Sequence, residues 1–291
     1  MAGVIAHLQI ATAIQEKVQL SSQDLPWLYA GALGPDIGYF PDADTMMSDL
    51  AHYHNTADLL RAIIHHARSS NEQAFALGWL SHWLTDCRTH PLVNQSVGQL
   101  KGLESVTYEE DTIAHQQVEI GLDACLATGS EYKLIEKLPV FTSENLEFLS
   151  SAYLSTYGIT LTGEALVAAF KSVRTNGSKV AQVAILQAVL WRLLRLPAPL
   201  IKTLLLDFLP LKVLCKVIGT KAPHYGLGTL VRPTAQFLEG WKLALKPLAR
   251  ESLVHWENNA DTLMNTNLDT GVLQEQDTYG LRQEILELIV V

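Results

Sequence analysis

Apolar residues recur along this chain at the three-to-four-residue spacing of α-helices, and sustained two-residue alternation is hard to find. This spacing places the apolar side chains of each segment on one helical face. The first half is predicted to form helices over 4–19, 26–33, 50–68, 71–88 with Ser70 as the candidate cap, 110–127, 144–157 and from 160 or 162 to 175. The second half is predicted to form helices over 179–196, 201–208, 211–218, 233–265 and 279–290. The pattern therefore predicts an all-α fold.

Glycine and proline mark the expected helix ends. Gly34 and Pro35 interrupt the chain after the second predicted helix, because glycine is permissive and proline constrains the residue before it. Pro91 lies near the expected end of the helix that contains residues 77–88. Gly158 follows its helix in the usual C-terminal position. These signals predict compact helices joined by short connections.

The stretch from Leu77 to Pro91 carries the strongest chemical signal. It places His82, Asp86 and His90 at successive spacings of four, which aligns them on one helical face. Apolar neighbours would hold that helix in a core, where an unpaired charge costs several kcal/mol. Either hydrogen-bonded core histidines or a divalent metal would satisfy these groups. A second helix repeats the spacing with an imidazole and a carboxylate, His115 and Glu119.

Composition narrows the possible chemistry. The chain has 291 residues, of which 48% are hydrophobic and 18% charged, so it can bury a large core. Its three cysteines form no Cys-x-x-Cys pair, which argues against both a disulfide framework and a cysteine-ligated zinc site. The ten histidines place any metal chemistry on imidazole and carboxylate ligands.

Charge and hydropathy divide the chain into two regions. We predict a metal-binding helical domain over 1–175 and a C-terminal helical region over 176–291, basic and apolar at 179–250 and packed on the first. The basic, apolar stretch 183–218 would either contact a membrane surface or pack as ordinary helices. We see no signal peptide and no apolar run long enough to span a bilayer, which predicts a cytoplasmic protein with possible peripheral membrane contact.

Five motifs occur in a recognisable order, and they are His7-Leu-Gln-Ile, Ala30-Gly-Ala-Leu-Gly-Pro-Asp36, His54-Asn-Thr, Gly78-Trp-Leu-Ser-His82-x3-Asp86-x3-His90 and His115-x3-Glu119. This order resembles the zinc-dependent phospholipase C family over residues 5–125. That family includes bacterial phosphatidylcholine-type phospholipases C and the catalytic domain of glycosylphosphatidylinositol-specific phospholipase D. Single-strand-specific zinc nucleases are more distant relatives.

The resemblance implies a multi-helix phospholipase C/nuclease-like bundle with two to three zinc ions at the base of a cleft. Carried over by position, the ligands of the first zinc would be Asp36, His54, His82 and Asp86. Those of the second would be His90, His115 and Glu119, and those of the third His7 and a bridging Asp86. His52 is the alternative to His54, and Asp36 is also the candidate general base.

The function implied is hydrolysis of a phospholipid, in which zinc-activated water attacks phosphorus and releases diacylglycerol and a phosphorylated headgroup. One departure concerns the headgroup, because Ile37 follows Asp36 where choline-preferring enzymes have a tyrosine. Two alternatives stay open. One is a single-strand nuclease or 3′-nucleotidase, with Tyr39, Phe40 and Trp83 as candidates for base stacking, although nucleic acid is the less favoured partner. The other is a metal-stabilised membrane-binding module without turnover.

Overall fold

A computed structural model describes residues 3–194 and 232–274 of the chain. The N-terminal part contains α1 (Val4–Gln15), α2 (Leu25–Ala32), the 3-10 helix η1 (Gly34–Tyr39), α3 (Thr45–Tyr53), α4 (Thr56–His66), α5 (Ser70–Lys101) and α6 (Thr112–Leu126). The later elements are α7 (Glu131–Glu136), η2 (Glu144–Leu146), α8 (Glu147–Tyr157), α9 (Gly163–Ser172), the π-helical η3 (Val173–Gly177), α10 (Ser178–Leu194), α13 (Ala235–Leu245) and α14 (Leu248–Glu257). The described residues contain no strand, which confirms the all-α prediction.

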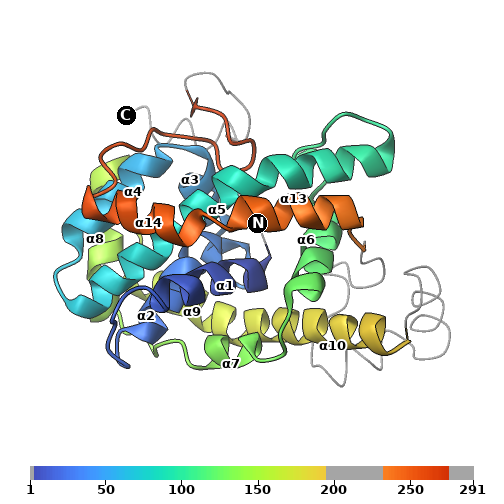
Figure 1. Cartoon of the computed structure of the whole chain (residues 1–291). Helices are drawn as coiled ribbons and strands as arrows, with labels where there is room; N and C mark the ends of the chain where they lie inside the picture. The colour runs from blue at the N-terminus through green and yellow to red at the C-terminus, as the bar shows by residue number, and fades with distance from the viewer. Residues whose placement is uncertain (1–2, 195–231, 275–291) are drawn as a thin grey trace.

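Helix α5 is the central element of this arrangement, and it contacts α1, α2, α4, α6, α13 and α14 (Figure 1). Ser69 caps its N-terminus together with Glu72 in a reciprocal capping box, and Gly102 ends it in the left-handed conformation. The helix continues through Pro91, so the prediction that it would end there was wrong. In the turns before Pro91 the buried hydroxyls of Thr85 and Thr89 are satisfied, because each donates to the carbonyl four residues earlier.

Two glycines allow α2 and α5 to pack backbone against backbone. A Cβ on Gly31 would lie 1.9 Å from the Phe75 carbonyl oxygen, and one on Gly78 would lie 2.1 Å from the Leu28 carbonyl oxygen. Any side chain at either position would force the helices apart. This close approach holds the following η1, and with it Asp36, beside α5.

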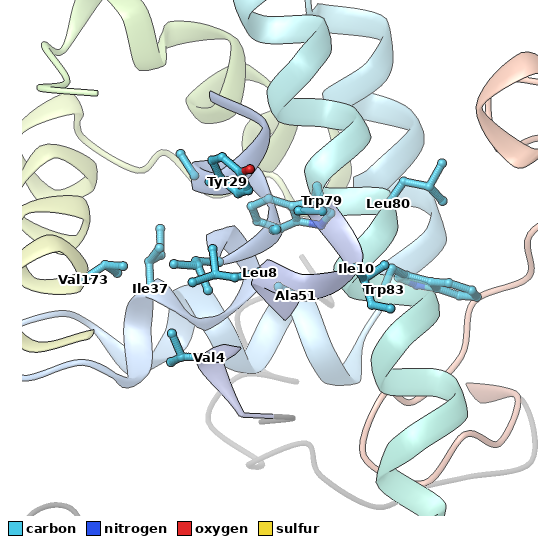
Figure 2. Close-up of a cluster of buried hydrophobic side chains, with 14 of the residues drawn as sticks. Val4, Leu8, Ile10, Tyr29, Ile37, Ala51, Trp79, Leu80, Trp83 and Val173 are labelled. Atoms are coloured by element: carbon cyan, nitrogen blue, oxygen red, sulfur yellow. The ribbon is translucent and has the colours of Figure 1, made fainter. Parts of the chain in front are cut away.

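The hydrophobic core surrounds the same helices. Figure 2 shows Trp79 and Trp83 of α5 among side chains from α1, α2 and η1, including Leu8, Tyr29 and Ile37. Trp79 is 1% exposed, and the indole N–H of Trp83 is satisfied by a 3.0 Å hydrogen bond to the Thr56 hydroxyl. A core of this density holds the polar residues of α5 in fixed positions.

The chain bends where a single helix over 50–68 is predicted. Helix α3 ends at Tyr53, His54 adopts an extended conformation, and Asn55 has a positive φ of 46°. Asparagine tolerates this left-handed conformation better than most residues. The bend separates His52, in the last turn of α3, from His54, which lies outside it.

The C-terminal part of the chain departs from the predicted helix over 233–265. Pro247 separates α13 from α14, since proline has no N–H to continue the helical hydrogen bonds. Residues 258–274 then follow an irregular path along α4, α3 and α5 (Figure 1).

Several sequence predictions concern residues outside the described ranges. These are the helices over 201–208, 211–218 and 279–290 and most of the stretch 183–218. Helix α10 packs on α6 and α7, and α13 and α14 pack on α5. The division of the chain at 175 stays a prediction, and this position lies inside the π-helical turn that joins α9 to α10.

Among the described helices, none combines the length and the apolar character that crossing a bilayer would require.

Candidate metal centre

Helix α5 and four elements packed around it bring imidazole and carboxylate side chains together. Each of these side chains is at most 2% exposed, and they are His7 of α1, Asp36 of η1, His52 of α3, His82, Asp86 and His90 of α5, and His115 and Glu119 of α6. The spacing of four in α5 aligns three of them, and the packing of the surrounding helices supplies the others.

Asp86 is the centre of the group. Its Oδ2 atom lies 3.0 Å from Nε2 of His82 and 3.3 Å from Nε2 of His52. Its Oδ1 atom lies 3.3 Å from Nε2 of His7 and 3.6 Å from Nε2 of His90. One carboxylate therefore faces four imidazoles from three helices.

Asp36, in η1, faces two of the same histidines. Its Oδ1 atom lies 3.3 Å from Nε2 of His52 and 3.8 Å from Nε2 of His82. The other ring nitrogens of these histidines contact backbone carbonyls, with Nδ1 of His52 2.7 Å from the Ser48 oxygen and Nδ1 of His82 2.8 Å from the Ala32 oxygen. A carbonyl can only accept, so each Nδ1 carries a proton, and Nε2 is the nitrogen that each ring turns toward the carboxylates and could offer to a metal.

His90, His115 and Glu119 lie on the α6 side of the group. Nε2 of His90 is 3.9 Å from Oε1 of Glu119. Nε2 of His115 donates to the Val106 carbonyl oxygen at 2.7 Å, which leaves Nδ1 as the lone-pair nitrogen of that ring. The two motifs with spacings of four, on α5 and α6, therefore approach each other through His90 and Glu119.

His54 takes no part in this group, in contrast to the preferred sequence assignment. It is half-buried after the end of α3, and its ring lies 6.4 Å from that of Tyr157. His52 lies in the group instead, because α3 continues through its position and the chain turns away only afterwards.

One acidic residue of the site was missed by the sequence reasoning. Asp269 comes from the irregular segment after α14, is 3% exposed, and places its Oδ1 atom 3.7 Å from Nδ1 of His90. No periodic pattern or motif spacing connects it with the histidines of the first half. Only the path of the folded chain brings it to the site.

The donor atoms suit a cation. Of the buried side-chain atoms without a hydrogen bond in the described chain, many converge here, including both carboxylate oxygens of Asp36 and Asp86 and Nε2 of His7, His52, His82 and His90. Two sets lie within chelating reach of a single ion, namely His7, His82 and Asp86, and Asp36, His52 and His82. Buried polar atoms left without partners are costly, and a bound divalent cation would satisfy them.

A known protein family matches the part of the chain that carries the histidines of this group. The family described as zinc-dependent phospholipase C matches residues 6–161, which is more than half of the chain. The chain belongs to this zinc-dependent phospholipase C family. No curated protein and no solved structure matches it significantly. Family membership and the two donor sets together indicate a zinc-binding, phospholipase C-like hydrolase.

The protonation of this phospholipase C-type site follows from burial and charge. Burial disfavours a proton on His52, but the carboxylates of Asp36 and Asp86 outweigh it and raise the pKa of His52 to about 9. Burial raises the pKa of Glu119 to about 8. For Asp86, burial acts in the same upward direction, yet the neighbouring histidines His90, His82 and His7 hold its pKa well below the usual range.

Zinc binding is therefore expected to release protons. Near pH 7 the metal-free site holds a proton on His52 and another on Glu119, because both pKa values lie above 7. A metal ligand must be deprotonated, so binding at pH 7 should release about two protons, and the apparent affinity should rise with pH until about pH 9. Titration calorimetry in buffers of different ionisation enthalpy measures this number. A release that does not change between pH 7 and pH 10 would contradict it.

Proposed function

We propose that this chain is a phosphodiesterase that hydrolyses phospholipids of the phospholipase C type. The observation that carries the proposal is the convergence of fully buried imidazole and carboxylate atoms without a hydrogen bond in the described chain, from the four elements α1, η1, α3 and α5. In the proposed assignment one zinc would be held by Asp36, His52, His82 and Asp86, a second by His90, His115 and Glu119, and a third by His7 and Asp86. His52 replaces His54 in this set because its Nε2 faces both Asp36 and Asp86.

Zinc at this position would activate water as the nucleophile and neutralise charge on the phosphoryl oxygens. The residues of the chain supply orientation and proton transfer. Burial would raise the pKa of Asp36, but His82 and His52 more than offset it and lower the pKa below the usual range. Asp36 is therefore an ionised carboxylate at neutral pH, able to accept a proton from water at Oδ1 or Oδ2. The Ser48 and Ala32 carbonyls keep His52 and His82 in the tautomer that presents Nε2.

A pocket of about 370 Å³ lies next to the site and would receive the substrate. Its lining includes Tyr39, Tyr53 and Tyr108, and the rings of the first two lie 5.4 and 6.2 Å from the ring of His52. The lining also contains Asp49 and Glu109 and no lysine or arginine among the described residues. Aromatic faces with nearby carboxylates favour a positively charged headgroup over an anionic one.

The direct test is hydrolysis of mixed micelles by the zinc-loaded protein. We expect a water-soluble phosphorylated headgroup and diacylglycerol to appear, with faster release from phosphatidylcholine or phosphatidylethanolamine than from phosphatidylglycerol. Chelation should abolish the release, and restored zinc should recover it. A protein that binds zinc and gains stability, yet hydrolyses neither phospholipid nor single-stranded DNA, would be the non-catalytic module instead.

The nuclease alternative retains one supporting observation, which is the aromatic lining of the pocket. Of the three candidates for base stacking, Tyr39 lines the pocket, whereas Phe40 and Trp83 are each 5% exposed in the core. Tyr53 and Tyr108 add aromatic surface beside Tyr39. The carboxylates at the same pocket disfavour a polyanionic strand. Hydrolysis of single-stranded DNA faster than of micellar lipid would establish the nuclease.

A further inference from the structure

The irregular segment 264–274 reaches the metal centre although it lies outside the residues matched by the family. It follows α14 and passes α4 and α3 before it meets α5 (Figure 1). The Thr56 hydroxyl donates to the Thr266 carbonyl at 2.7 Å, and the Leu268 N–H donates to the His52 carbonyl at 2.8 Å. This segment is therefore joined to the backbone of a proposed ligand.

The segment is also fixed on α5 beside His90. The Asn94 side chain, one turn after His90, donates to the Asp269 carbonyl at 2.8 Å. Gly271 has a φ of 71°, and a Cβ there would lie 2.9 Å from both the Cys87 carbonyl oxygen and Cγ of Pro91. Proline at 91 cannot donate to the Cys87 carbonyl, so the helix surface is open to this close approach. The backbone around position 269 therefore has little freedom.

Hydrogen bonds fix both the side chain and the backbone of Asp269. Its Oδ2 atom accepts from the Tyr108 N–H at 3.0 Å, and its backbone N–H donates to the Asn267 side chain at 2.9 Å. Its Oδ1 atom lies 3.7 Å from Nδ1 of His90, and neither atom has a hydrogen-bond partner within the described chain. The opposite nitrogen of His90, Nε2, faces Asp86 and Glu119.

We propose that Asp269 is a positioning residue of the metal centre, which accepts a hydrogen bond from Nδ1–H of His90 and so aims Nε2 at the metal. The inference rests on the proposed function, because it requires His90 to be a ligand. A movement of under about 1 Å brings the two atoms to hydrogen-bond distance. A carboxylate in this place fixes the tautomer of a ligating histidine and increases its basicity. The C-terminal part of the chain would thereby complete a centre whose ligands all come from the first half.

The test compares zinc and cobalt binding by the full-length wild type and Asp269→Asn. We expect affinity for the ion held by His90 to fall about 10- to 100-fold in the variant. The visible absorption spectrum of the cobalt-loaded protein should also change, because His90 loses its fixed orientation. Asp261→Asn, an exposed acid in the stretch before this segment, is the matched control and should bind both metals as the wild type does.

A double-variant cycle separates positioning from other roles. If Asp269 acts through His90, then Asp269→Asn should weaken binding no further in a His90→Ala background. Additive losses would overturn the proposal and would indicate that Asp269 ligates directly. Unchanged affinity and spectrum in Asp269→Asn, with zinc still bound by the wild type, would overturn it while leaving the proposed function intact. A wild-type protein that binds no zinc would instead refute the proposed function itself.

Discussion

Replacement of Asp86 by asparagine is expected to cost more than one bound zinc ion. The two oxygens of Asp86 face four imidazoles, with His7 and His90 on Oδ1 and His52 and His82 on Oδ2. Asparagine keeps the shape of the side chain but replaces an ionised oxygen with an N–H donor, which cannot bind a cation. Hydrolysis should fall at least about a thousandfold, since several kcal/mol of transition-state stabilisation is lost.

The matched comparison is His7→Ala, which removes a ligand from one side of the group. Zinc content after gel filtration, measured by plasma mass spectrometry, should fall by at most one equivalent in this variant and by more than one in Asp86→Asn. Circular dichroism of both proteins checks that they remain folded. Equal losses of zinc would show that Asp86 does not bridge the metal positions.

His52→Ala and His54→Ala are expected to differ strongly although the residues are two positions apart. His52 is 2% exposed, and its Nε2 lies 3.3 Å from both Asp36 and Asp86. Its loss should remove the zinc held with Asp36 and lower hydrolysis by about a hundredfold or more, because the remaining donors cannot complete that ion's coordination. His54 is half-buried and packs near Tyr157. His54→Ala should keep the zinc content of the wild type and hydrolysis within about twofold.

Zinc content and initial rates on micellar lipid, measured side by side, check this pair. The stability of each metal-free variant should be recorded as well, because His52 also contacts the Ser48 carbonyl. Loss of zinc in His54→Ala with full zinc in His52→Ala would reverse the assignment.

The predictions from sequence succeed where a helix alone determines the geometry. Residues four apart on α5 must share a face, so His82, Asp86 and His90 could be placed together before any tertiary structure was known. The same reasoning applies to His115 and Glu119 on α6. The order of the motifs indicated the family, which the match over residues 6–161 confirms.

The predictions fail where the backbone departs from helical periodicity. The sequence left His52 and His54 as alternatives, and it did not show that the helix predicted over 50–68 would break between them, where His54 is extended and Asn55 has a positive φ. The predicted end of α5 near Pro91 was wrong because the tertiary contacts of a long central helix outweigh one missing hydrogen bond.

The sequence by itself therefore determined the helical class, the family and the residues of each chelating face, because these depend on local periodicity and on motif order. Tertiary structure decided which of two neighbouring histidines enters the centre and brought Asp269 to His90. The first outcome depends on the end of α3 and the bend at Asn55, and the second on contacts of residues 264–274 with α5 through Asn94 and Gly271. Such contacts form only when the helices pack, so no local pattern encodes them.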